Sequence, residues 1–154
     1  MYAVTTLGHG DAQLALTVME REVVRHGGAA VLAVADSHGE LIALLRMDGA
    51  KFASTTIAAN KAYTAAREQV PSKTIGLLAR DPSAGFDIAY FGDGRFVGWG
   101  GGVPVVVDGA CIGAVAVSGL PEAVDIEIAA FAADALVASI TAERAAASAV
   151  STAN

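Results

Sequence analysis

The feature that most constrains this chain is a glycine-rich passage, residues 96–104, which reads Phe-Val-Gly-Trp-Gly-Gly-Gly-Val-Pro. An apolar run over residues 105–117 follows it, and Asp108-Gly109 supplies the turn of a predicted hairpin. Glycine inside a strand costs conformational entropy and packs no side chain. Four glycines beside two β-branched runs therefore indicate that something approaches this backbone closely. The sequence leaves open whether that object is a ligand, a partner subunit or a neighbouring helix.

Apolar periodicity and turn residues predict the elements around this passage. Helical spacing predicts helices from Asp11 to the Gly27-Gly28 pair, over 57–69, over a short stretch ending at 78, and over 121–138. Continuous apolar runs separated by turn residues predict hairpins over 29–47 and 105–117, and one further strand is expected within 86–97. The expected helix caps are Asp11, Ser54 or Thr55, and Ser72.

This order of elements contains hairpins rather than β-α-β crossovers. It predicts an α+β fold in which helices pack on a mainly antiparallel sheet. The length of 154 residues fits one domain with a core over about residues 11–138, and the tail 141–154 either extends the last helix or frays. The triple glycine leads into a strand and not into a helix, so it is not the dinucleotide-binding fingerprint.

The composition is unusually apolar, with 54% hydrophobic and 17% charged residues. A membrane span needs about 20 consecutive apolar residues, and charged residues or glycine interrupt every run well before that length. We therefore expect a homo-oligomer in which part of the apolar surface is buried between copies, and no association with a membrane. The first residues lack the pattern of a signal peptide, which favours a cytoplasmic protein.

Several function classes are disfavoured by the residues present. The net charge is −6 and the basic residues are scattered, which argues against a nucleic-acid partner. The single cysteine, Cys111, excludes an internal disulfide, and no paired cysteine or histidine spacing indicates a metal site. The three histidines lie far apart, and Ser118-Gly119 lacks the context of a nucleophilic serine.

The candidate site is built around Lys61, which lies among alanines at 58, 59, 62 and 65. A partly buried ammonium there would have a lowered pKa and could act as an acid, a base or an anion anchor, whereas a lysine extending from a helix edge to solvent is the alternative. We expect Lys61 to border one concave cleft with Gly100, Gly101 and Gly102, closed by Asp125 near the start of the last helix. Arg46, at a strand end, is a second candidate anion contact.

Five segments in this order resemble the GlcG/HbpS-like family, which also forms the C-terminal domain of PduO-type proteins. They are AVAD (33–36), LRMDGA (45–50), NKAYTA (60–65), GGGVP (100–104) and GAVAVSG (113–119). The resemblance extends over about residues 11–138. It implies an α+β domain with a five-stranded antiparallel sheet, a homo-oligomer and, in some members, haem binding or haem-linked redox chemistry.

This chain departs from the family pattern in its polar residues. Asn60 stands where the family usually has an aspartate before the helix lysine, and Ala123-Val124 replace a Glu-Gln pair before Asp125. Part of the usual polar site is therefore neutral or apolar here, and no axial haem ligand is carried over from the family.

Three functional hypotheses follow. The first is a small-molecule binding protein whose ligand is haem or another flat, partly anionic molecule. The second is an enzyme that acts on a small pathway intermediate, with Lys61 and Asp125 in acid–base roles. The third is a structural oligomeric unit without a ligand.

Overall fold

The computed structural model describes residues 3–152, and the side chains of residues 3–150. The two hairpins and four helices predicted from the sequence are confirmed, and a short 3-10 helix is added. In chain order the elements are α1 (His9–Arg25), β1 (Val31–Asp36), β2 (Leu41–Arg46), α2 (Ala53–Glu68), α3 (Ser72–Ala79), η1 (Ile88–Tyr90), β3 (Gly102–Val107), β4 (Ala110–Ser118) and α4 (Glu122–Thr152).

The described strands form one antiparallel sheet in the order β2-β1-β4-β3. The two hairpins join through β1 and β4, which pair from Val31 opposite Ser118 to Asp36 opposite Gly113. These central strands are almost wholly buried because helices cover both faces of the sheet. The expected α+β class and antiparallel pairing are therefore confirmed.

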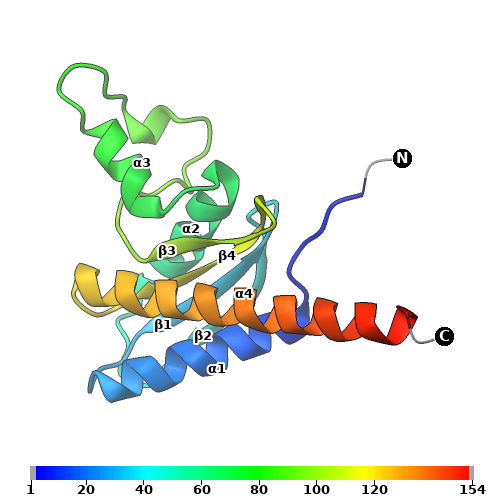
Figure 1. Cartoon of the computed structure of the whole chain (residues 1–154). Helices are drawn as coiled ribbons and strands as arrows, with labels where there is room; N and C mark the ends of the chain where they lie inside the picture. Colours follow the sequence, from blue (N-terminus) through cyan, green and yellow to red (C-terminus); the bar gives the residue numbers. More distant parts are fainter. Residues whose placement is uncertain (1–2, 153–154) are drawn as a thin grey trace.

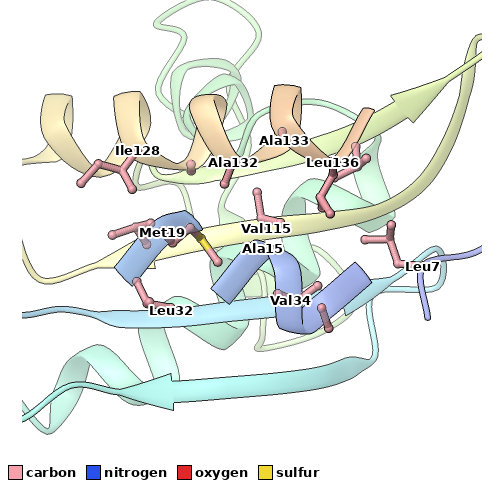
Figure 2. Packing of buried hydrophobic residues seen from close by; sticks show 14 of the residues in the cluster. Leu7, Ala15, Met19, Leu32, Val34, Val115, Ile128, Ala132, Ala133 and Leu136 are labelled. Atoms are coloured by element: carbon pink, nitrogen blue, oxygen red, sulfur yellow. The ribbon is translucent and has the colours of Figure 1, made fainter. Parts of the chain in front are cut away.

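The larger core lies between the sheet and the pair α1 and α4, which run side by side across one face (Figure 1). Met19 of α1 and Ile128 and Leu136 of α4 point toward Leu32 and Val115 of the central strands (Figure 2). All five side chains are excluded from solvent. Their burial supplies a large share of the hydrophobic free energy that stabilises the fold.

The opposite face is covered by α2, whose inward residues are small. Ala58 and Ala62 pack on Val31, Ala33 and Ala116 of the sheet. Because alanine side chains are short, the α2 backbone comes close to the strands. This close approach explains one of the glycines discussed above: a Cβ at Gly102 would stand 2.3 Å from the carbonyl oxygen of Lys61.

The predicted fifth strand is wrong, since the described sheet has four strands. The backbone of this region bonds to helices before it reaches the sheet at Gly101: the Val97 N–H donates to Thr64 Oγ1 of α2 at 3.0 Å, and the Gly100 N–H donates to Glu122 of α4. Gly98 lies directly on Gly76 of α3, where a Cβ would stand 2.0 Å from the Gly98 carbonyl oxygen. Pro104, which lacks an N–H, fits the position of β3 at the edge of the sheet.

The predicted helix caps are also corrected. α2 starts at Ala53, directly after Phe52, so neither Ser54 nor Thr55 is its cap. Asp11 lies inside α1, two residues after the observed start, and its carboxylate accepts the Gly8 N–H at 2.8 Å. Asp11 therefore caps α1 from its third residue and not from the N-cap position, which Gly8 occupies.

Ser72 is not at the N-cap position of its helix either. It is the first residue of α3, which follows Pro71, and its hydroxyl is buried. The hydroxyl donates to the Trp99 carbonyl oxygen at 2.6 Å and accepts the Gly102 N–H at 3.0 Å. Through these two hydrogen bonds Ser72 links the start of α3 to the glycine-rich passage.

The tail continues α4 through Thr152 instead of fraying within the described residues. Residues 141–150 are all exposed, and this end of the helix projects beyond the sheet (Figure 1). Residues 153 and 154 of the predicted tail lie outside the described residues.

Replacing Gly102 by alanine is expected to lower the free energy of unfolding by about 1–3 kcal/mol, because the added methyl group would overlap the Lys61 carbonyl oxygen. Gly10→Ala in α1 is the matched control, since nothing lies within 4 Å of its added Cβ. Alanine is the better helix former, so this variant should be more stable by about 0.5–1 kcal/mol. Urea unfolding measures both variants, and effects of the same sign would contradict this account of the glycines.

Candidate functional site

A buried ion pair between α2 and α4 forms the centre of the candidate site. Lys61 Nζ lies 3.1 Å from Asp125 Oδ2 and donates a second hydrogen bond to the Val117 carbonyl oxygen at 2.9 Å. Both residues are only 3% exposed. The alternative in which Lys61 extends from a helix edge into solvent is therefore wrong.

The chain holds the Asp125 carboxylate in place through the turn that joins β4 to α4. Its Oδ1 accepts the Leu120 N–H at 3.1 Å and its Oδ2 accepts the Gly119 N–H at 3.4 Å. The carboxylate therefore receives two backbone donors in addition to the Lys61 ammonium. Such charge-assisted hydrogen bonds fix the geometry of a buried pair more firmly than the ion pair alone.

Burial changes the proton affinity of both partners. It lowers the pKa of Lys61 and raises the pKa of Asp125, and in each residue the charge and hydrogen bond of the other partly oppose the change. The two pKa values are thus brought closer together than they are in water. A proton passes between such groups, or to a bound molecule, at a lower energetic cost than between exposed groups.

The pair lines a cavity of about 570 Å³ that lies between α2, α3, the glycine-rich passage and the start of α4. Lys61, Gly100 and Asp125, which we expected to border one cleft, meet there. The cavity is lined by four basic side chains and two carboxylates, and therefore carries two positive charges in excess: Lys51, Lys61, Lys73, Arg80, Glu122 and Asp125. The chain as a whole has a net charge of −6, so this local excess is opposite in sign.

Gly101 and Gly102 lie beneath the cavity and do not line it. A Cβ at Gly101 would stand 3.0 Å from both Lys61 Nζ and the Asp125 Cβ, and Gly101 has a φ of +113° that favours glycine. The object that approaches this backbone is therefore the chain itself. The glycines leave the space in which the ion pair forms.

The N–H groups of Gly100 and Gly102 are engaged within the chain. Gly100 donates to Glu122 Oε1 at 2.8 Å, just as Gly102 donates to Ser72. The Lys73 ammonium and the Gly100 N–H together lower the pKa of Glu122. The Gly100 N–H, which belongs to the glycine of this passage that lines the cavity, is therefore not free to bind a ligand.

Arg46 is not brought to this cavity. It is exposed at the end of β2, and its guanidinium lies 5.0 Å from the centroid of the Phe52 ring. Its role as an anion contact remains a prediction.

Sequence reasoning did not identify Lys51, Lys73, Arg80, Trp99 and Glu122, all of which line the cavity. One signal was present: residues seven apart on a helix share a face, and Lys73 and Arg80 stand seven apart at the two ends of α3. Trp99 and Lys51 lie outside regular elements, where periodicity gives no guidance.

Across residues 3–150, no group of three or more His, Cys, Asp or Glu side chains is arranged to hold a metal ion. No helix in the described part of the chain combines the length and apolarity needed to cross a membrane.

Asp125→Asn is expected to lower the free energy of unfolding by about 3–5 kcal/mol at neutral pH, because it leaves the Lys61 ammonium buried without its carboxylate. In this variant no Asp125 carboxylate counteracts the effect of burial, so the pKa of Lys61 in the folded protein is lowered further. The unfolded lysine keeps a pKa of about 10.4. Between these two pKa values the unfolded chain binds more protons, so the stability of the variant should rise with pH.

Urea unfolding from neutral pH to about pH 10 measures this dependence. Glu127→Gln is the matched control, because it removes an exposed carboxylate from the same helix and should change stability by less than about 0.5 kcal/mol. A stability of Asp125→Asn that stays constant or falls as pH rises would exclude an unpaired buried ammonium.

Comparison with known proteins places the chain in a family. The model described as "Haem degrading protein HbpS-like" matches residues 7–134. Protein GlcG of Escherichia coli (strain K12) is 36% identical over 99 residues, which are 64% of this chain and 71% of GlcG.

Solved structures agree with this assignment. Klebsiella pneumoniae protein ORFY has a TM-score of 0.83 and 28% identity, with 88% of this chain and 94% of ORFY covered. PduOC, solved as a complex with haem, has a TM-score of 0.78 and 25% identity, with 85% of this chain and 95% of PduOC covered. The resemblance carried by the five sequence segments is thus confirmed, and the chain belongs to the HbpS-like family.

Proposed function

We propose that this protein binds a small organic anion in the cavity beside Lys61 and Asp125. The observation that carries the proposal is the excess of two positive charges in that cavity, within a chain of net charge −6. Lys51 and Arg80 contribute this excess, since neither has an ion-pair partner among the described residues. Cations without a local counter-charge attract an anionic ligand.

A carboxylate fits these donors. The planar guanidinium of Arg80 can bind it through two parallel hydrogen bonds, and Lys51 adds a second full charge. Lys61 has three N–H groups, and Val117 and Asp125 accept two of them. Trp99, which is 58% exposed, gives the cavity an aromatic wall for the apolar part of a ligand.

Proton transfer to or from the bound anion is the chemistry that Lys61 and Asp125 could add. The pair lines the cavity and its two pKa values are shifted toward each other. In that case Lys61 would donate a proton to the ligand, the Asp125 carboxylate would orient the ammonium, and water would return the proton to Lys61. The enzymatic hypothesis is therefore an extension of the binding site and not a separate site.

Haem is the second candidate ligand, because the family description names haem degradation and PduOC was solved with haem. The cavity offers cations to the haem propionates. Its described lining contains no His, Met, Cys or Tyr, so it does not offer a usual axial ligand to the iron. In a hemin titration, a Soret band that saturates at fixed stoichiometry would support haem, and unsaturable association would reject it.

Binding of propionate is expected to quench or shift the fluorescence of Trp99, the single tryptophan of the chain, in a saturable way. Arg80→Gln should weaken this binding by about 10-fold, which is the scale of one charge-assisted contact. Arg21→Gln is the matched control, because it removes the same charge from α1 on the other side of the sheet. An equal loss in both variants, or no saturation in the unmodified protein, would contradict the proposed site.

We also propose that the protein is a homo-oligomer. Exposed apolar side chains on the layer formed by α1 and α4, such as Phe131 at 54% exposure and Val24, support this proposal. Light scattering at micromolar concentration should give a mass of at least twice the 15.5 kDa of one chain. A mass of 15.5 kDa would exclude burial between copies as the explanation of the apolar composition.

A further inference from the structure

A second cavity, of about 390 Å³, lies between α3 and the segment 86–99. Its walls are mainly apolar and partly aromatic: Phe86, Ile88, Phe96, Val97 and Trp99. Phe91 supports this wall from behind, with its ring centroid 4.8 Å from those of both Phe86 and Phe96. The interlocked rings fix the shape of the cavity in a segment that has no sheet partner.

The floor of this second cavity is bare backbone. Gly76 of α3 and Gly98 both line it, and each is in direct contact with the other. A Cβ at Gly76 would stand 2.0 Å from the Gly98 carbonyl oxygen, and a Cβ at Gly98 would stand 2.5 Å from the Gly76 Cα. The two glycines therefore pack backbone to backbone and form a floor without side chains. The slot that suits a flat ring is the space over this floor, between the aromatic walls.

The two cavities are joined at Arg80 and Trp99, which line both of them. On one side of these residues lies the positive cavity that holds Lys61 and Asp125. On the other side, Arg80 and Asp87 are the only ionisable residues of the described lining. The Asp87 carboxylate accepts the Ala89 N–H at the start of η1. The charge available to an anion is therefore concentrated on the Lys61 side.

We propose that the two cavities form one site for an aromatic carboxylate. The carboxylate lies in the positive cavity near Arg80 and Lys51, and the aromatic ring passes Trp99 into the second cavity, over the floor formed by Gly76 and Gly98 and beside Ile88. This inference rests on the proposed anion-binding function and specifies its ligand class.

Three probes separate the two halves of the site in the full-length protein. Propionate carries only the anionic group, 3-phenylpropionate carries both groups, and 3-phenylpropan-1-ol carries only the ring and chain. Calorimetry together with Trp99 fluorescence should show 3-phenylpropionate binding at least about 10-fold more tightly than propionate, because one ring leaves water. It should also bind about 10-fold more tightly than the alcohol, which lacks the charge.

Ile88→Asp places a carboxylate in the proposed ring slot. In this variant the affinity for 3-phenylpropionate should fall to nearly that for propionate, and the affinity for propionate should stay unchanged. Leu77→Asp is the matched control, since Leu77 is exposed on α3 and lines neither cavity. The control should keep the full advantage of the aromatic acid.

Equal affinities for propionate and 3-phenylpropionate would overturn the two-part site and leave the anion proposal intact. Failure of both acids to bind would reject both proposals. Equal affinities for the acid and the alcohol would reject the anionic half, and an unchanged advantage in Ile88→Asp would show that the ring lies elsewhere. The ligand comparison needs no variant, so it stands even if Ile88→Asp fails to fold.

Discussion

The packing of α2, the glycine-rich passage and the start of α4 depends on one interaction, the buried ion pair between Lys61 and Asp125. Taking both charges out of water is unfavourable, and only close contact and additional hydrogen bonds offset it. The alanine-rich face of α2 brings Lys61 to the sheet, and Gly101 leaves room for its ammonium. The turn before α4 holds Asp125 with two backbone N–H groups. The alanines of α2, Gly101 and the turn before α4 therefore all support the same ion pair.

The same features determine how the cavity above the pair can recognise a ligand. The N–H groups of Gly100 and Gly102 are already bonded to Glu122 and Ser72, so these two groups are not available to an anion. The cationic side chains Lys51 and Arg80 remain, at the rim of a cavity whose net charge opposes that of the chain. The described lining of this cavity contains no usual iron ligand, which is why we propose a small carboxylate ahead of haem for this member of the HbpS-like family.

The sequence was sufficient to predict the elements with regular periodicity and to predict which residues meet around Lys61. The helices and hairpins followed from apolar spacing, and the placement of Lys61 beside Gly100 and Asp125 followed from a charged residue among alanines and from unexplained glycines. The prediction of a fifth strand was wrong because the contact between Gly76 and Gly98 joins distant parts of the sequence and leaves no periodic signal. Arg80 and Trp99 were missed for a related reason: a helix end and an irregular segment meet only after folding.

The most direct test of the central claim is the pKa of Lys61, followed through its side-chain carbon resonances by NMR with and without saturating carboxylate. An anion held beside Lys61 stabilises the ammonium. The account therefore predicts that the pKa of Lys61, which burial lowers in the free protein, rises when the ligand is bound. A carboxylate that binds while the pKa of Lys61 stays the same would show that the ligand lies elsewhere.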